Sequence, residues 1–217
     1  KTHVKGVVPW DAHRSLMMVS MRGPVLLDHN QQDTPVPLAE DKLQWLSRND
    51  NILSRQLWRL DDFILCDTTE LYLLSRFYGF VRLDMEAQSL RVIAHPTGSA
   101  SYGVAYKGVV HDPVSASVWA YGNTEIVVFR RRHAGTNDQV LRLSSHLLNG
   151  IEQVLIDQKY GNVFLKKGEG LYLLNRYTGV ITPIEGNINV HKSMATLQDD
   201  KLIVAGRFGV AVYKIYG

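Results

Sequence analysis

Short runs of hydrophobic residues recur along the whole chain and are separated by stretches rich in glycine, aspartate and proline. The runs are too short for buried helices, and their many β-branched and aromatic residues favour buried strands. The segment 151–184 has four similar copies elsewhere, each predicting strand, turn, strand, turn and strand. The copies span residues 6–38, 63–93, 108–143, 151–184 and 194–215, and the fifth lacks a final strand.

Each copy carries an aspartate in its first turn, and the spacing of these acids measures the repeat. Successive acids are 56, 45, 45 and 42 residues apart. Three of these spacings fall within the ~40–50 residues of a propeller blade. The longest spacing, the first, has a local cause, because residues 39–58 are more polar and lose the strand pattern. We expect an insertion there, as a short helix or a long loop. The acids are Asp11, Asp67, Asp112, Asp157 and Asp199.

Glycines precede the third strand of each copy, where they can take the positive φ of tight hairpins. The sequence therefore predicts an all-β fold of antiparallel meanders. We expect a β-propeller of about five blades, or a fragment of a larger one, as a single domain over residues 1–217. The second strands should be buried between blades, as represented by Met18, Leu73, Trp119, Phe164 and Ile203.

The fifth copy lacks its outer strand and leaves a strand edge that needs a partner, because an unpaired edge can pair with other chains and aggregate. The segment Thr2-His3-Val4 is a candidate for the missing outer strand and would close a ring by strand exchange. If it does not pair there, another segment or a second chain must cover the edge.

The fourth copy resembles the repeat of two-component regulator propellers. It carries an aspartate turn, then Gly161-Asn162, Gly170-Leu171-Tyr172 and Tyr177-Thr178-Gly179, but has Phe164 where that repeat usually has tryptophan. The resemblance implies a propeller and favours sensing in a signalling receptor.

The second and third copies are similar to blades of the N-terminal propellers of class C vacuolar tethering subunits. The matching strings in the third copy are Trp119-Ala120-Tyr121 and Val128-Phe129-Arg130. This resemblance also implies a propeller, with a role in protein recognition.

Composition and charge narrow the function only slightly. The net charge of +3 indicates a mixed surface with no footprint for nucleic acid. The single cysteine, Cys66, lies in an apolar run, which predicts a buried, inert thiol. We favour the cytoplasm, with the bacterial periplasm as the alternative. No stretch reaches the ~18 apolar residues of a membrane span. Because the sequence begins with Lys1 and not with methionine, we expect it to be a segment of a longer protein.

No motif of nucleophilic, phosphate-binding or metal-dependent catalysis occurs in the sequence. The eight histidines are scattered without ligand spacing. We therefore predict no enzyme activity, no cofactor and no metal. The turn aspartates have two interpretations, paired carboxylates as in propeller glycosidases or caps of turn amides, and we favour the caps.

Arginines and aromatic residues in turns are the best candidates for binding a partner, because these residue types supply most interface hot spots. One group follows second strands: Arg76, Phe77, Tyr78, Arg207 and Phe208. The other follows a third strand: Arg130, Arg131 and Arg132. Packing at the core edge is the competing interpretation of the first group, and a solvated hairpin end that of the second.

These observations favour a non-catalytic scaffold that binds another protein through propeller loops. The rival hypothesis is an extracytoplasmic ligand-sensing domain of a signalling receptor, and the third is a carbohydrate-active or lectin-like propeller. Helical repeats downstream would favour tethering, whereas a membrane span with a kinase or DNA-binding domain would favour sensing.

Overall fold

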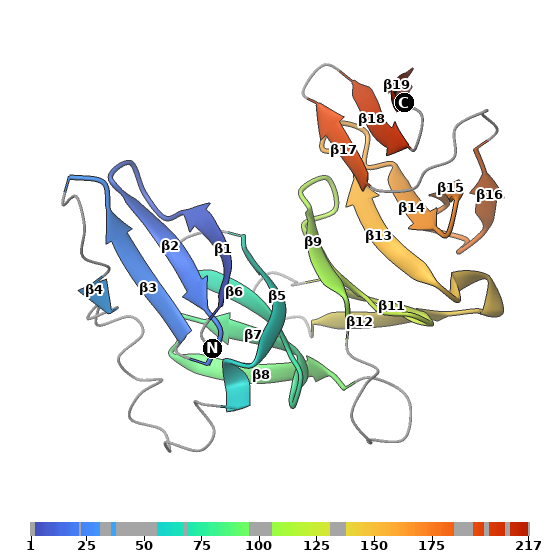
Figure 1. Cartoon of the computed structure of the whole chain (residues 1–217). Helices are drawn as coiled ribbons and strands as arrows, with labels where there is room; N and C mark the ends of the chain where they lie inside the picture. The colour runs from blue at the N-terminus through green and yellow to red at the C-terminus, as the bar shows by residue number, and fades with distance from the viewer. Residues whose placement is uncertain are drawn as a thin grey trace. The chain divides into compact units, whose positions relative to one another are not determined.

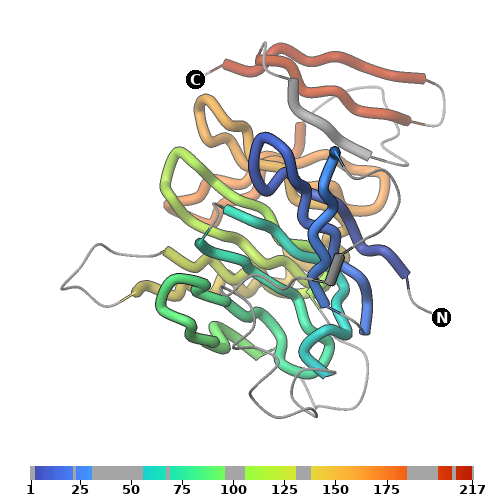
Figure 2. Tube along the Cα trace, turned by 90° about the vertical axis from the view of Figure 1, so that its left-hand side faces the viewer, coloured from blue at the N-terminus to red at the C-terminus, as the bar shows by residue number. Residues whose placement is uncertain are grey.

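The computed structural model (Figure 1) describes residues 3–21, 23–30, 36–37, 56–66, 69–95, 106–130, 138–184, 193–197, 200–206 and 209–216. These residues form five antiparallel sheets in which strands adjacent in sequence are adjacent in space. Each sheet is a meander, as the repeat predicts. We call the sheets blades 1 to 5 in chain order. The tube view in Figure 2 follows the chain through each blade as successive hairpins.

The five blades fall into two compact units, residues 1–109 and residues 110–217, with the boundary inside β9. Unit 1 contains blade 1, with β1 (Val4–Pro9), β2 (Arg14–Val19), β3 (Gly23–Asp28) and β4 (Val36–Pro37), and blade 2, with β5 (Leu60–Leu65), β6 (Glu70–Ser75), β7 (Gly79–Asp84) and β8 (Ser89–Ala94).

Unit 2 contains the other three blades and one short 3-10 helix, η1 (His146–Leu148). Blade 3 has β9 (Gly108–Asp112), β10 (Ser117–Tyr121), β11 (Glu125–Arg130) and β12 (Gln139–Ser144); blade 4 has β13 (Ile151–Ile156), β14 (Val163–Lys167), β15 (Gly170–Leu174) and β16 (Ile181–Pro183); blade 5 has β17 (Ser193–Leu197), β18 (Lys201–Gly206) and β19 (Gly209–Lys214).

Unit 1 buries an apolar core between its two blades. Side chains alternate across a strand, so Leu16 and Met18 share one face of β2, while Leu71 and Leu73 share one face of β6. All four side chains are fully buried and belong to the same cluster. The alternating apolar positions of blades 1 and 2 thus become the two halves of one core.

Unit 2 repeats this arrangement twice. Trp119 of blade 3 packs in one cluster with Val154 and Leu165 of blade 4. Phe164, next to Leu165, packs in a second cluster with Leu202 of blade 5. Because neighbouring residues of a strand point to opposite faces, β14 contacts blade 3 with one face and blade 5 with the other.

The predicted burial of the second strands is confirmed at Met18, Leu73, Trp119 and Phe164. It is wrong at Ile203, which is only partly buried, whereas Leu202 and Val204 fill the core position. In a run that is apolar at every position, the hydrophobic pattern does not distinguish the two faces. The packing of blade 5 on blade 4 makes that choice.

Two other sequence expectations are corrected. Cys66 is partly exposed rather than buried, because it follows the last residue of β5 and has left the core. Val4 opens β1 and pairs with Val19, so it belongs to the first strand of blade 1, while Thr2 lies outside the described residues. Residues 39–55 of the expected insertion lie outside the described residues, but Gln56 and Leu57 form a helical turn, and Leu57 is buried in the core of unit 1.

The meander divides the turns of each blade between two ends of its sheet. Turns that follow the first and third strands lie at one end, which we call the aspartate end because it carries the first-turn acids. Turns that follow the second strand lie at the other end. This geometry decides which loops of a blade can act together.

Candidate functional site

The first-turn aspartates cap backbone amides, which confirms the capping interpretation for the three that the structure describes. Each carboxylate accepts hydrogen bonds from amides two or three residues further along the chain, as in an Asx-type turn. Asp67 and Asp199 lie outside the described residues. The principal bonds run from His13 N to Asp11 (2.9 Å), from Val114 N to Asp112 (3.1 Å) and from Tyr160 N to Asp157 (2.7 Å).

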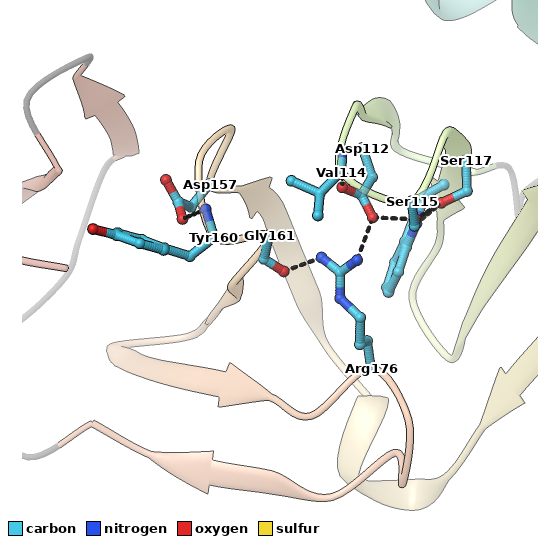
Figure 3. Close-up of polar contacts among 9 residues, drawn as sticks. Asp112, Val114, Ser115, Ser117, Asp157, Tyr160, Gly161 and Arg176 are labelled. Atoms are coloured by element: carbon cyan, nitrogen blue, oxygen red, sulfur yellow. Dashed lines mark hydrogen bonds and ion pairs between the residues drawn. The ribbon is translucent and has the colours of Figure 1, made fainter. Parts of the chain in front are cut away.

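In unit 2, one of these turns also holds a buried ion pair, shown in Figure 3. Arg176, from the turn between β15 and β16, donates to Asp112 Oδ2 through Nη1 at 2.6 Å. Its Nη2 donates to the carbonyl oxygen of Gly161. The Asp112 side chain is fully buried and that of Arg176 is 11% exposed. Arg176 thus joins one turn of blade 3 to two turns of blade 4.

A chain of hydroxyl groups extends this contact into the core of blade 3. Ser115 donates to Asp112 Oδ2, and the Ser115 and Ser117 hydroxyls lie 2.7 Å apart. The Ser117 oxygen accepts from Trp119 Nε1 at 2.8 Å. The buried carboxylate is therefore hydrogen-bonded on several sides, which is the condition for burying a charge.

Blades 4 and 5 are joined at the same end of their sheets. Lys159 Nζ contacts Asp200 Oδ2 at 2.6 Å, and the side-chain amide of Asn162 donates to the carbonyl oxygen of Tyr216 at 3.1 Å. The hydrogen bond to Asp200 raises the pKa of Lys159 above its ordinary value, with Tyr160 adding to the effect. The turn between β13 and β14 is thus bonded to blades 3 and 5 through Arg176, Lys159 and Asn162.

Three exposed tyrosines stand on these linked turns: Tyr160 after β13, Tyr177 after β15 and Tyr216 after β19. Their exposed fractions are 39%, 88% and 73%. The Lys159 ammonium lies 4.8 Å from the centre of the Tyr160 ring. We call Tyr160, Tyr177, Tyr216 and Lys159 the tyrosine face. Exposed aromatic rings on braced turns can stack on a ligand and donate hydrogen bonds to it, because tyrosine has an apolar body and a polar tip.

Three of the residues predicted from sequence to bind a partner, Arg76, Phe77 and Tyr78, lie at the other end of blade 2. Arg76 and Phe77 are exposed in the turn between β6 and β7. Arg76 Nε donates to Asp61 at 2.8 Å, and the Arg59 guanidinium lies 5.3 Å from the Phe77 ring centre. Tyr78 is partly buried against the core of unit 1. The structure therefore leaves Arg76 and Phe77 accessible, and it places Tyr78 in the core-edge position.

The remaining predicted residues are only partly described. Arg130 is exposed at the end of β11, a third strand, and so lies at the aspartate end of blade 3. The other four, Arg131, Arg132, Arg207 and Phe208, lie outside the described residues. The use of any of these arginines and aromatics in binding stays a prediction.

Sequence reasoning missed the bracing residue and the tyrosines. Arg176 precedes the Tyr177-Thr178-Gly179 string, which was informative only as a repeat marker. The sequence shows a tyrosine in each of two aspartate-end turns of blade 4. Arg176 connects these turns to Asp112, but the two residues are 64 positions apart in the sequence and meet only through packing.

Blade 2 contains a second buried charged group, built within one sheet. Arg82 Nη2 contacts Glu70 and lies 2.7 Å from Asp84 Oδ2, while the Tyr72 hydroxyl donates to Glu70 at 2.8 Å. Burial raises the pKa of Tyr72, and the neighbouring Glu70 charge adds to the rise. Tyr72 is therefore a protonated hydrogen-bond donor at physiological pH, which fits a structural role.

Among the described residues, no group of three histidine, cysteine, aspartate or glutamate side chains is arranged to hold a metal ion. In the same part of the chain, no helix is long and apolar enough to cross a membrane.

The chain resembles several solved structures across nearly its whole length. The extracellular domain of BT4673 from B. thetaiotaomicron, a proposed one-component system, matches with 12% identity and a TM-score of 0.65 over 97% of this chain and 28% of that one. The extracellular domain of BT3049 from the same organism, a proposed hybrid two-component system, matches with 14% identity and a TM-score of 0.61 over 98% and 27%. YCF48 bound to D1 peptide matches with 13% identity and a TM-score of 0.58 over 98% and 67%.

No protein-family model and no curated protein matches the chain in sequence. The chain spans less than a third of the length of the two extracellular domains. At these identities the likeness establishes the fold. The chain has a β-propeller fold, or a section of one, built of meander blades that resemble two-component regulator propeller repeats.

Proposed function

We propose that this chain is part of an extracytoplasmic propeller that senses a ligand for a signalling receptor. The observation that carries the proposal is the match of nearly the whole chain to the extracellular domains of two proposed sensor systems. It supports ligand sensing over the protein-binding scaffold that the propeller repeat and the absence of a catalytic motif favoured in the sequence. The resemblance to vacuolar tethering subunits adds no support beyond the fold.

The tyrosine face is the ligand-binding surface in this proposal. It combines exposed aromatic rings with a turn that is bonded to both neighbouring blades, so its side chains are held on a rigid support. A ligand that stacks on Tyr160 and Tyr177 would touch turns fixed by Arg176. Binding would therefore stabilise the seam between blades 3 and 4 as well as the turns.

A thermal-shift panel of amino acids, short oligosaccharides and peptides, followed by calorimetry on the compounds that raise the melting temperature, tests this function. The Tyr160→Ala, Tyr177→Ala double variant should weaken binding of such a compound at least about tenfold, a loss of about 1.4 kcal/mol. The matched control is Arg76→Ala, an exposed substitution at the other end of a blade, which should leave the affinity unchanged. Unchanged binding in the tyrosine double variant, together with weakened binding in Arg76→Ala, would place the ligand-binding surface away from the tyrosine face.

Protein binding is the second candidate, because one similar propeller, YCF48, is bound to a peptide. In this case the turn of Arg76 and Phe77 carries the contact, since arginine and aromatic residues dominate interface hot spots. Capture of native partners, followed by calorimetry on the Arg76→Ala, Phe77→Ala variant, tests it. A hot-spot site predicts a loss of at least about 2 kcal/mol in binding free energy. An unchanged affinity would exclude this turn.

A further inference from the structure

The ammonium group of Lys159 lies between two groups that come from neighbouring blades of unit 2. One is the carboxylate of Asp200, in the turn between β17 and β18, with 2.6 Å between Nζ and Oδ2. The other is the ring of Tyr160, whose centre lies 4.8 Å from Nζ. Carboxylates and aromatic rings are the groups with which proteins bind ammonium ions. We call Asp200 and Tyr160 the ammonium site.

The two walls of the ammonium site are held by bonds that do not involve Lys159. The carbonyl oxygen of Asp200 accepts a hydrogen bond from Ile215 N at 2.6 Å, and its side chain is only 21% exposed. On the other wall, Tyr160 precedes Gly161, whose carbonyl oxygen accepts from Arg176. Groups that are held in place before a ligand arrives lose little freedom on binding it.

The present occupant of the site is held less firmly than the walls. The Lys159 side chain is 56% exposed. Exposed ion pairs contribute little stability, because water screens the charges and a long side chain loses freedom when it is fixed in one geometry. Competition from Lys159 should therefore lower the affinity of another ammonium group at most about fivefold. Lys159 is an occupant that a ligand can displace.

One oxygen of the ammonium site has no donor. Lys159 bonds Oδ2 of Asp200, whereas Oδ1 is buried and has no hydrogen-bond partner among the described residues. A buried acceptor without a donor is unfavourable, and native proteins normally satisfy such groups. An ammonium group carries three N–H donors. One that enters from solution is not tied to the backbone of Lys159, so it can bond both carboxylate oxygens.

We propose that Asp200 and Tyr160 bind a primary ammonium group at the end of an aliphatic chain, and that Lys159 occupies the site until this ligand arrives. The ligand has the chemistry of the side chain that it replaces, with N–H donors for the carboxylate and a positive charge over the ring. A free polyamine and a lysine side chain of a peptide share this chemistry. The inference rests on the proposed ligand-sensing function and names its class of ligand.

Displacement of Lys159 can be followed directly by NMR of the lysine side chains in the whole chain. The probes are putrescine, a free amine, and Nα-acetyl-lysine amide, a lysine side chain; butanediol and Nα-acetyl-norleucine amide are their uncharged controls. A bound probe should shift the Lys159 Cε signal toward that of a free lysine, whereas the controls should leave it unchanged. Binding of either probe supports the site, and the tighter probe identifies the source of the ligand.

Methylation of the probe separates the two contacts of the site. A trimethylated ammonium group keeps its charge over the Tyr160 ring but has no N–H to donate to Asp200. It should bind at least about tenfold more weakly than the primary amine, because the charge-assisted hydrogen bonds are lost. Equal binding of the two forms would contradict the role of the carboxylate.

Substitutions separate the site from its occupant. Lys159→Met removes the competing ammonium group and should strengthen probe binding up to about fivefold. Asp200→Asn should weaken it at least about tenfold, because the charged acceptor is lost. Asparagine tolerates the positive φ of 56° at this position, and retained exchange protection of the Ile215 amide shows that the turn is intact.

The matched control is the other lysine that lies over a tyrosine ring in unit 2. Lys214 Nζ is 5.4 Å from the centre of the Tyr216 ring. Lys214→Met removes the same charge from the same blade end as a lysine that the proposal does not use, so it should leave probe affinity unchanged. An increase equal to that of Lys159→Met would mean that net charge, and not the ammonium site, controls binding.

Two further results would overturn the ammonium site. A Lys159 signal that stays in place while a probe binds would place the probe elsewhere. Failure of both amines to bind Lys159→Met, together with binding of another panel compound through Tyr160 and Tyr177, would exclude the amine class and leave the proposed sensing function standing. Failure of the amines and of every compound in the panel would contradict the proposed function as well.

Discussion

The aspartate turns of blade 1 and blade 3 begin from the same local geometry and end with different roles. In blade 1, Asp11 bonds its own turn and pairs with Arg14 three residues away, with both side chains 35% exposed. In blade 3, Asp112 bonds its own turn and pairs with Arg176 in the next blade, and the Asp112 side chain is fully buried. A repeated turn can thus be a local cap or an anchor between blades, depending on which arginine reaches it.

The two units join their blades in different ways. In unit 1, the Trp58 indole packs closely on Gly23, so closely that a Cβ added to Gly23 would lie 2.9 Å from the ring. The carbonyl oxygen of Trp58 also accepts a hydrogen bond from Met21 N at 2.8 Å. In unit 2, apolar clusters are supplemented by Arg176 and Lys159, which cross from blade to blade at the aspartate end. Unit 2 therefore couples its loops to its core.

The largest expected effect comes from the buried pair. Arg176→Met should destabilise unit 2 by about 3–5 kcal/mol, because it leaves Asp112 buried without its partner. Denaturant titration with residue-resolved hydrogen exchange measures this loss. The double variant Asp112→Asn, Arg176→Met should recover part of it. Arg14→Met, the exposed counterpart in blade 1, should leave stability within experimental error, and an equal loss there would remove the distinction between the two turns.

Loss of one core tryptophan in each unit tests whether the apolar seams are comparable. Trp119→Ala and Trp58→Ala should each cost about 3–5 kcal/mol, the usual range for deletion of a large buried aromatic side chain. Both side chains are at most 6% exposed. Chemical denaturation of each variant gives the loss. A cost below about 1 kcal/mol for Trp119→Ala would mean that β10 is misplaced.

A smaller effect separates backbone strain from the bracing contact. Gly161 and Gly179 both have positive φ, 71° and 73°. A Cβ added at Gly161 would clash with the Arg176 guanidinium, whereas a Cβ added at Gly179 would have nothing within 4 Å. Gly179→Ala should cost about 1–2 kcal/mol, the penalty of the left-handed backbone. Gly161→Ala should cost more, because it also displaces Arg176. Equal melting curves for the two variants would contradict the bracing role.

The smallest effect is in the titration of two aspartates of unit 1. A hydrogen bond from Arg14 holds the pKa of Asp11 below its ordinary value, whereas burial raises the pKa of Asp62 despite its bonds from backbone amides. NMR titration should give midpoints on opposite sides of 3.8. The stability contributed by Asp11 is present above its unfolded pKa and is lost as pH falls through the folded value. Asp62 has the opposite sign, since its ionised form is disfavoured in the folded protein.

The meander and its core positions were readable from the chain because strand burial depends on local alternation. Met18, Leu73, Trp119 and Phe164 were all identified correctly as buried. Ile203 was not, because every position of its run is apolar and the choice of face rests on blade 4. The capping role of the described aspartates was also accessible, since a carboxylate two or three residues from a free amide needs no distant partner.

By itself, the sequence determined the repeat, the strand order within each blade and the places of the turns, because each of these depends on neighbours within about 50 residues, the longest propeller repeat. Only the tertiary structure decided that Arg176 reaches Asp112, and that Tyr78 packs inward while Arg76 and Phe77 stay exposed. These features depend on which blade faces lie against each other. Side chains far apart in sequence acquire partners only when those faces pack, so no local pattern records them.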